Sequence, residues 1–271
     1  MSADTERPVS RFGTPFRIGS TSYVYPDDIL PNVQRLAAEG DVDDIELILF
    51  EVDDGATNLP DLRTIDALRE LAAQHNLTYS VHLPLDLTLA ADGSAQHQSL
   101  VKAERVIRLT QPLAPYAYVF HLDGQGVGAP AWIDRALRAL EIVIGWAGDP
   151  SLLAVENLET WSPHYLDPIL ARLPISRTMD IGHLWKTGVD PLSVLELWLP
   201  RTRVIHLHGV GERDHKSLAL MPPEQLDPVI AALMAQPYRG VLTLEVFETA
   251  DFFSSRAALL ESVARVRAWA A

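Results

Sequence analysis

The sequence contains no cysteine among its 271 residues, and no apolar run approaches the roughly 18 residues that a transmembrane helix needs. The absence of cysteine excludes disulfides, thiolate metal sites and a cysteine nucleophile. The first residues, MSADTERPVSRFGTPF, lack the apolar segment of a signal peptide. We therefore expect a cytoplasmic protein without a membrane partner, in which any metal ion is bound by imidazole and carboxylate groups.

Positive charge is also scarce, because 22 Lys and Arg residues stand against 36 Asp and Glu residues, giving a formal net charge of −14 at pH 7. Proteins that bind nucleic-acid polymers draw much of their affinity from Lys and Arg, and no basic cluster stands out here. We therefore expect a small-molecule substrate rather than DNA or RNA. The sequence leaves the oligomeric state open.

Short runs of β-branched and aromatic residues alternate with longer amphipathic segments along the chain. The expected strands are residues 17–24, 44–52, 78–85, 117–123, 152–158, 176–182, 203–209 and 240–247. The expected helices are residues 28–39, 60–75, 97–111, 130–147, 163–172, 191–198, 223–235 and 254–269. Eight such units in about 250 residues match a single-domain (β/α)8 TIM barrel. We assign residues 15–271 to this catalytic domain and expect residues 1–14 to be a flexible N-terminus.

Histidine and carboxylate side chains stand near the ends of six consecutive expected strands. In a TIM barrel the carboxyl ends of the strands form the active-site face, so polar residues there indicate chemistry. The set consists of His82, His121, Glu156, Asp180, His183, His206, His208 and Glu245. Three further histidines, His75, His97 and His164, lie in helices or loops, and we interpret them as structural.

The alternation of side chains along each strand tests whether this polar set can converge, because residues two apart share a face. It predicts inward-pointing side chains at Ala154, Glu156, Val204, His206, His208, Thr243 and Glu245. The intervening residues, such as Ile205 and Leu244, then face the helices. The predicted ligands therefore point into one barrel mouth.

Several carboxylates and imidazoles in a buried mouth are costly unless a cation compensates them. Imidazole and carboxylate ligands together suit Zn²⁺, Mn²⁺, Fe²⁺ or Co²⁺ rather than Ca²⁺. We expect divalent metal ions as cofactors, with Zn²⁺ or Mn²⁺ favoured and two or three ions per chain.

At these residues the sequence resembles the xylose-isomerase-like, apurinic-endonuclease-type superfamily of TIM barrels. The matching stretches read VHLP, VFHLD, VENLE, MDIGH, VIHLH and TLEVF, and they extend over nearly the whole chain. The endonuclease-like members hold three zinc ions. The resemblance implies a third metal site at His183, Asp214 and His215, although the adjacent Asp214 and His215 depart from the D-x-H spacing of those members.

Within this superfamily the sequence is similar to the CbiR group of cobamide-remodelling phosphodiesterases. The stretches STSYVYPDDILPNVQRLA, DDIELILFE, NLPD, TYSVHLPLDL and HLHGVGERDHKSL carry this similarity. Such enzymes hydrolyse the phosphoester linkage in the nucleotide loop of cobamides and release the lower ligand. The resemblance implies a metal-dependent phosphoric ester hydrolase in corrinoid salvage, with a cobamide or another phosphoester as its substrate.

Two metal ions about 4 Å apart can activate water, bind a phosphoryl oxygen and stabilise the leaving oxygen. For this reaction we expect Glu156 to bridge the ions, His82 and His121 to complete one site, and Asp180, His206 and Glu245 to complete the other. The expected catalytic residues are Glu156, Glu245, His183, His208, Arg213 and Lys216. Of these, Arg213 and Lys216 are the nearest cations for binding phosphate.

Two other functions stay open on the residues alone. A sugar isomerase or epimerase would use one metal ion, with Glu156 and Glu245 as acid and base on either side of the substrate carbon. A non-catalytic barrel would bind metal or store a corrinoid without turnover. The pair His82 and His121 discriminates between the enzymes, because one metal ion does not need it and two ions do.

Overall fold

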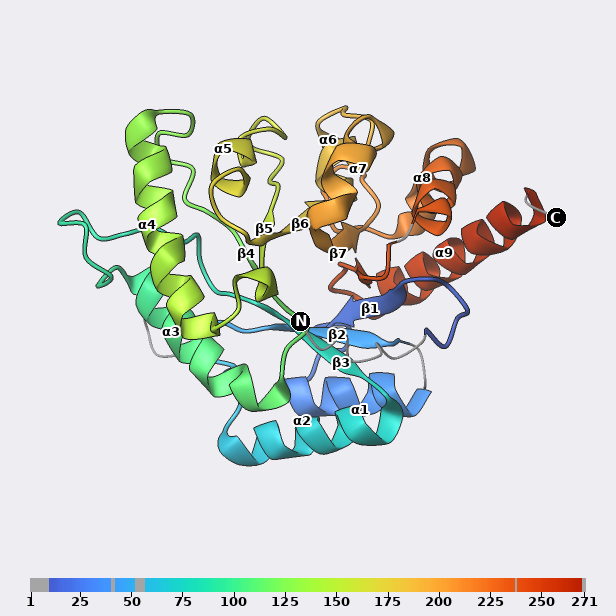
Figure 1. Ribbon diagram of the computed structural model, residues 1–271. Helices are drawn as coiled ribbons and strands as arrows, with labels where there is room; N and C mark the ends of the chain where they lie inside the picture. Colours follow the sequence, from blue (N-terminus) through green and yellow to red (C-terminus); the bar gives the residue numbers. More distant parts are fainter. Residues whose placement is uncertain (1–9, 40–41, 52–56, 237, 270–271) are drawn as a thin grey trace, which may run out of the picture.

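The computed structural model describes residues 10–39, 42–51, 57–236 and 238–269. Eight parallel strands close into a barrel in sequence order, and the helices pack around it (Figure 1). The strands are β1 (Arg17–Thr21), β2 (Asp44–Ile48), β3 (Thr78–His82), β4 (Ala117–Phe120), β5 (Leu153–Glu156), β6 (Ser176–Asp180), β7 (Thr202–Leu207) and β8 (Val241–Leu244). The predicted single-domain TIM barrel is confirmed.

The helices follow the strands as the periodicity predicts. They are α1 (Ile29–Glu39), α2 (Leu62–His75), α3 (Gln98–Thr110), α4 (Pro130–Ala147), α5 (Asp167–Leu170), α6 (Ile181–Lys186), α7 (Leu192–Trp198), α8 (Pro223–Ala235) and α9 (Thr249–Trp269). Short 3-10 helices lie at η1 (Gln111–Leu113), η2 (Pro150–Leu152), η3 (Leu199–Arg201) and η4 (Leu218–Leu220). None of the described helices is long and apolar enough to cross a membrane.

Several elements are shorter than their sequence patterns. The expected helix 163–172 is reduced to α5, because Pro168 has no backbone N–H to donate to an earlier carbonyl. The expected strand 176–182 ends at Asp180, whose carboxylate accepts a hydrogen bond from the backbone N–H of His183 and so caps α6. The expected strand 44–52 ends at Ile48, and Val52 lies outside the described residues.

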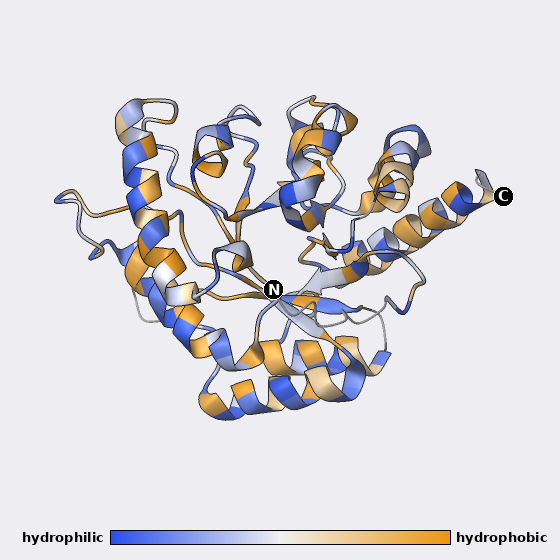
Figure 2. Ribbon diagram, viewed as in Figure 1, coloured by the Kyte–Doolittle hydropathy of each residue, from blue (hydrophilic) through white to orange (hydrophobic). Residues whose placement is uncertain are grey.

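The core has two layers that follow the alternation predicted for the strands. A small apolar cluster inside the barrel contains Ala117, Val119, Ala154 and Val204. The larger core lies between strands and helices and includes the intervening residues, such as Ile205. Figure 2 shows that the helices combine hydrophobic and hydrophilic sides, as expected for helices packed on a barrel. Apolar burial therefore fixes which strand residues face the barrel interior.

The chain before β1 packs on the barrel from residue 10 onward. The Ser10 hydroxyl donates a 2.8 Å hydrogen bond to the Asp43 carboxylate, and Thr14 is buried and donates to the carbonyl of Phe16. Residues 10–14, which the sequence analysis assigned to a flexible terminus, are therefore docked. Residues 1–9 lie outside the described residues.

Candidate metal centre

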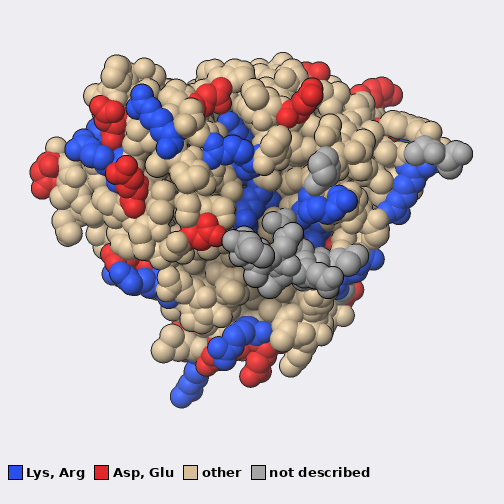
Figure 3. All heavy atoms as spheres, viewed as in Figure 1, with Lys and Arg blue, Asp and Glu red and all other residues tan. Residues whose placement is uncertain are grey.

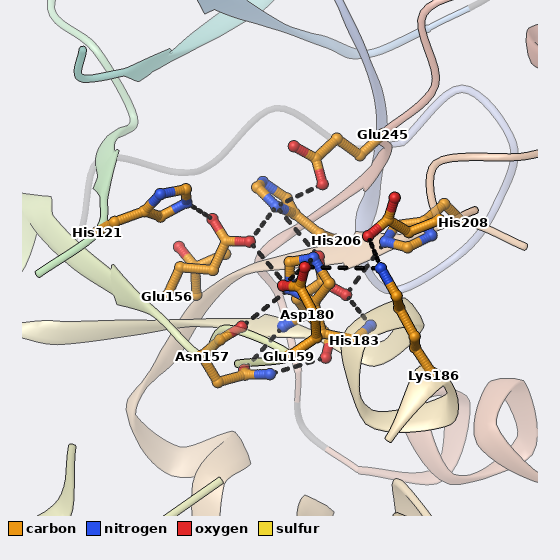
Figure 4. A network of polar contacts seen from close by, with 12 residues as sticks. His121, Glu156, Asn157, Glu159, Asp180, His183, Lys186, His206, His208 and Glu245 are labelled. Atoms are coloured by element: carbon orange, nitrogen blue, oxygen red, sulfur yellow. Dashed lines mark hydrogen bonds and ion pairs between the residues drawn. The ribbon is translucent and has the colours of Figure 1, made fainter. Parts of the chain in front are cut away.

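Imidazole and carboxylate groups from the ends of β3 to β8 meet at the carboxyl-terminal mouth of the barrel (Figure 4). They form overlapping groups whose ligand atoms lie within 4.8 Å of one another. The groups are His82, His121 and Glu156; Glu156, Asp180, His206 and Glu245; Asp180, His183, His208 and His215; and Glu159, His183 and Asp214. Every residue that the sequence analysis predicts as a metal ligand falls into one of these groups.

The first group faces one oxygen of Glu156. Its Oε2 lies 3.2 Å from Nε2 of His121 and 3.6 Å from Nε2 of His82. The opposite nitrogens are held from outside, because Nδ1 of His82 lies 3.0 Å from the carbonyl of Leu83 and Nδ1 of His121 lies 3.3 Å from Asp86. An Nδ1–H that donates outward leaves the Nε2 lone pair free for a metal ion. Both rings are thus oriented as ligands.

The second group faces the other oxygen of Glu156. Nδ1 of His206 lies 3.3 Å from Oε1 of Glu156, 3.1 Å from Oε2 of Glu245 and 3.9 Å from Oδ2 of Asp180. Nε2 of His206 lies 3.0 Å from the buried carboxylate of Glu46, which orients the ring by the same principle. Glu156 therefore belongs to both groups, with a different oxygen directed at each.

The third group contains a histidine, His208, whose ring is held by the backbone. Its Nδ1 lies 3.0 Å from the backbone nitrogen of His215 and 3.2 Å from the carbonyl of Gly209. Nε2 of the same ring lies 3.3 Å from Oδ1 of Asp180. His215 reaches this position with a left-handed φ of 53°, a strained conformation for a residue other than glycine. The loop thus fixes the His208 ring beside Asp180, and His206, which lies close to both Glu156 and Glu245, is the better placed metal ligand of the two.

Four buried atoms in these groups test whether the residues fit a cation. Within the described parts of the chain, Oδ2 of Asp180, Nδ1 of His206, Nε2 of His208 and Oε2 of Glu245 are buried without a hydrogen-bond partner. Unpartnered buried polar atoms are costly, yet here they face one another. A divalent ion satisfies such a set of oxygens and imidazole nitrogens, so the residues fit the metal.

The electrostatics of the centre lead to the same conclusion. Burial opposes the protonation of His121, but the Glu156 and Asp86 carboxylates outweigh it and raise the pKa of His121 to about 10. Burial also raises the pKa of Glu156, but His206 and His121 outweigh it and hold that pKa well below its ordinary value. The carboxylates therefore stabilise a positive charge beside them. Protons on the imidazole rings supply that charge here, and a metal ion can replace these protons.

The cations differ from the sequence prediction. Arg213 is exposed, and its side chain makes no hydrogen bond or ion pair with the residues that the structure describes. Nζ of Lys216 lies 3.3 Å from Glu248 and 3.5 Å from Asp251, so it points to the start of α9. Lys186 lies in the centre instead, with Nζ paired to the carboxylate of Asp214 (Figure 4).

Sequence reasoning missed three residues of the centre, namely Glu46, Glu159 and Lys186. Glu46 could have been found, because it alternates with Ile45 and Leu47 and so faces the barrel interior. Glu159 and Lys186 lie beyond their strands, where strand alternation gives no guide. The three histidines interpreted as structural lie outside every ligand group that the described residues form.

An aromatic-lined cavity of about 420 Å³ adjoins the metal centre, with Tyr23, Tyr25 and Phe247 among its lining residues. The Phe247 ring centroid lies 5.4 Å from that of His215. A larger cavity of about 490 Å³ has Arg201 and Arg203 in its wall. The contact between Phe247 and His215 places the aromatic-lined cavity beside the third ligand group.

Charged side chains are distributed unevenly on the molecular surface. Figure 3 shows Lys and Arg gathered near the centre of the face in view, with Asp and Glu scattered around them. The ligand groups themselves are rich in carboxylates, and among the described residues Lys186 is the lysine that contacts them, through Asp214 and Glu159. The carboxylates of the metal centre are therefore balanced by Lys186 and by protonated imidazoles, a charge that a metal ion can supply instead.

Residues 34–269 match the family described as xylose isomerase-like TIM barrel. The chain belongs to this family. A search of curated proteins finds no match. The xylose isomerase-like assignment confirms the superfamily that the sequence motifs resemble, and it leaves the CbiR group without support from the comparisons.

Solved structures with this fold include different enzymes. A D-tagatose 3-epimerase-like protein matches with a TM-score of 0.71 and 19% identity, over 94% of this chain and 100% of that chain. Endonuclease IV from Thermus thermophilus matches with a TM-score of 0.66 and 19% identity, over 92% and 99%. An L-ribulose 3-epimerase matches with a TM-score of 0.66 and 16% identity, over 94% and 97%. At such identities the likeness establishes the fold, and the reaction must be argued from the site.

Proposed function

We propose that this protein is a phosphodiesterase that depends on two divalent metal ions. The observation that carries the proposal is the position of Glu156 between two ligand groups, with Oε2 directed at His121 and Oε1 directed at His206. A carboxylate in this position can bridge two ions, and a centre with one ion has no use for the first group. Two ions, when bound, supply positive charge to a phosphoryl group and acidify water.

The residues of this chain position the reacting groups. One ion would be held by His82, His121 and Glu156. The other ion would be held by Asp180, His206 and Glu245, together with the same Glu156. Glu46 keeps His206 in the orientation that a ligand requires. Nε2 of His208 lies 3.3 Å from Oδ1 of Asp180, beside the carboxylate that the second ion would use.

The substrate we propose is a cobamide, cleaved at the phosphoester of its nucleotide loop. The sequence similarity to the CbiR group supports this choice. The cavity beside Phe247 is compatible with it, because aromatic walls suit a planar base such as the lower ligand of a cobamide. Cleavage at this point belongs to corrinoid salvage, for which we propose a cytoplasmic location and no nucleic-acid polymer as partner.

A second candidate is a sugar epimerase that uses one metal ion. Two observations favour it: Glu156 and Glu245 both lie close to Nδ1 of His206, and several similar structures carry the names of sugar epimerases. Two carboxylates on opposite sides of a sugar carbon could act as acid and base. The first ligand group has no role in this reaction.

The decisive experiment compares the two reactions with one preparation. Metal-free protein is reloaded with Zn²⁺ or Mn²⁺ and incubated with cobalamin, and in parallel with D-tagatose. Products are separated by chromatography and weighed by mass spectrometry, which also identifies the ester bond that is cut. Release of a lower-ligand fragment supports the phosphodiesterase, whereas an intact cobalamin with epimerised sugar supports the second candidate.

A further inference from the structure

Lys186 occupies a place where the surrounding residues could otherwise bind a metal ion. Its side chain extends from the end of α6 toward the ligand groups (Figure 4). Nζ pairs with Oδ2 of Asp214 and lies 3.6 Å from Oε1 of Glu159. These two carboxylates, together with His183, make up the fourth ligand group. The ammonium of Lys186 is therefore paired with two of the three residues of the fourth ligand group.

The third member, His183, completes this arrangement. Its Nδ1 lies 3.0 Å from the carbonyl of Asn157, and its Nε2 lies 3.4 Å from Oε2 of Glu159. With Nδ1–H donating to the carbonyl, Nε2 presents a lone pair to the same space. One imidazole nitrogen and two carboxylates form a donor set for a divalent ion, and a lysine ammonium already balances part of their charge.

The third ligand group is a poorer site for a further metal ion. It consists of Asp180, His183, His208 and His215, of which Asp180 is shared with the second ligand group and His183 with the fourth. This group therefore has only His208 and His215 as ligands of its own. Nε2 of His215 lies 3.2 Å from Oε2 of Glu245, a residue of the second ligand group.

We propose that the ammonium group of Lys186 takes the place of a third metal ion, so that the centre binds two ions and one fixed positive charge. The inference rests on the two-ion centre of the proposed function. The Lys186 side chain is one-third exposed, so one side of the ammonium can meet an anionic group of the substrate. Asp214 then serves to hold this lysine and is not a metal ligand.

The test counts metal ions and does not depend on turnover. Metal-free protein is equilibrated with Zn²⁺ at a buffered free concentration, and bound zinc per chain is measured by mass spectrometry. We expect two ions in the wild type and three in Lys186→Ala, because the substitution opens the fourth ligand group. Lys102→Ala, which removes a lysine that bonds the carbonyl of Glu51, a residue of none of the ligand groups, should keep two ions.

A double variant identifies the position of the additional ion. Lys186→Ala combined with Asp214→Ala should return to two ions, because the fourth group then lacks a ligand. Three ions in the wild type, no gain in Lys186→Ala, or three ions in the double variant would each overturn the inference. A wild type with one ion that gains one ion in Lys186→Ala would refute the two-ion centre and still support the role of Lys186, so the two failures are distinguishable.

Discussion

Nε2 of His206 lies 3.0 Å from the carboxylate of Glu46, and neither side chain is exposed to solvent. The contact leaves Nδ1 of His206 directed at Glu156 and Glu245. A buried carboxylate behind an imidazole fixes both the tautomer and the ring direction of a metal ligand. Glu46, which itself lies outside the ligand groups, therefore prepares His206 for metal binding.

Glu46→Gln should weaken metal binding at the second group by about 10 to 100-fold, the usual cost of losing such a partner. Competition with a chromophoric chelator measures the affinity. Glu104→Gln on the surface of α3, where Glu104 pairs with Arg108, serves as the control and should bind metal normally. An unchanged affinity in Glu46→Gln would contradict the orienting role.

Metal binding should release protons at neutral pH. The pKa of His121, raised to about 10 in the metal-free centre, means that this ring is protonated at pH 7 and must lose a proton to become a ligand. Because protons compete with the ion, affinity should fall as the pH is lowered and rise as the pH approaches 10. Calorimetric titration of the metal in two buffers of different ionisation enthalpy measures the protons released, and a value of zero at pH 7 would contradict the account.

Gly182→Ala should displace His208. A Cβ at position 182 would lie 2.1 Å from Cε1 of His208, a distance that the ring can relieve only by moving. Since a misplacement of about 1 Å can cost 100-fold in rate, we expect a loss of about that size in kcat. Gly145→Ala in α4, where a Cβ meets no atom within 4 Å, is the matched control. Wild-type activity in Gly182→Ala would argue against a fixed His208.

Phe247→Ala should raise KM for a substrate with a planar base by about tenfold, because stacking of one base on an aromatic ring contributes roughly 1 to 3 kcal/mol. A small dialkyl phosphodiester, which has no base to stack, should be cleaved as by the wild type. Phe253→Ala on α9, which removes a different partly exposed phenylalanine, is the control. Equal effects on both substrates would assign Phe247 a structural role only.

The barrel and the inward direction of the ligands could be predicted from the sequence because both depend on local patterns. Eight alternating units determine the architecture, and two-residue periodicity in β7 places His206 and Val204 on the inner face. The ends of the elements were less predictable. Pro168 shortened one helix, and the capping role of Asp180 turned the end of a predicted strand into α6.

The contacts beyond the strands could not be predicted, since they depend on how loops and helix ends fold back on the mouth. The alternation pattern cannot reveal that Lys186 meets Asp214 across 28 residues, or that Lys216 turns to α9 instead. The position of the His208 ring depends on the backbone of Gly209 and of His215, which has a left-handed conformation. Such details require the structure.

The position of Glu156 between the two ligand groups is the central claim, and Glu156→Gln tests it most directly. Zinc content and cobalamin cleavage are measured for this variant and the wild type, with circular dichroism to verify the fold. We predict two ions and cleavage for the wild type, and a folded variant with depleted zinc at both sites and no turnover. A variant that keeps two ions and cleaves cobalamin at the wild-type rate would contradict the bridging role of Glu156.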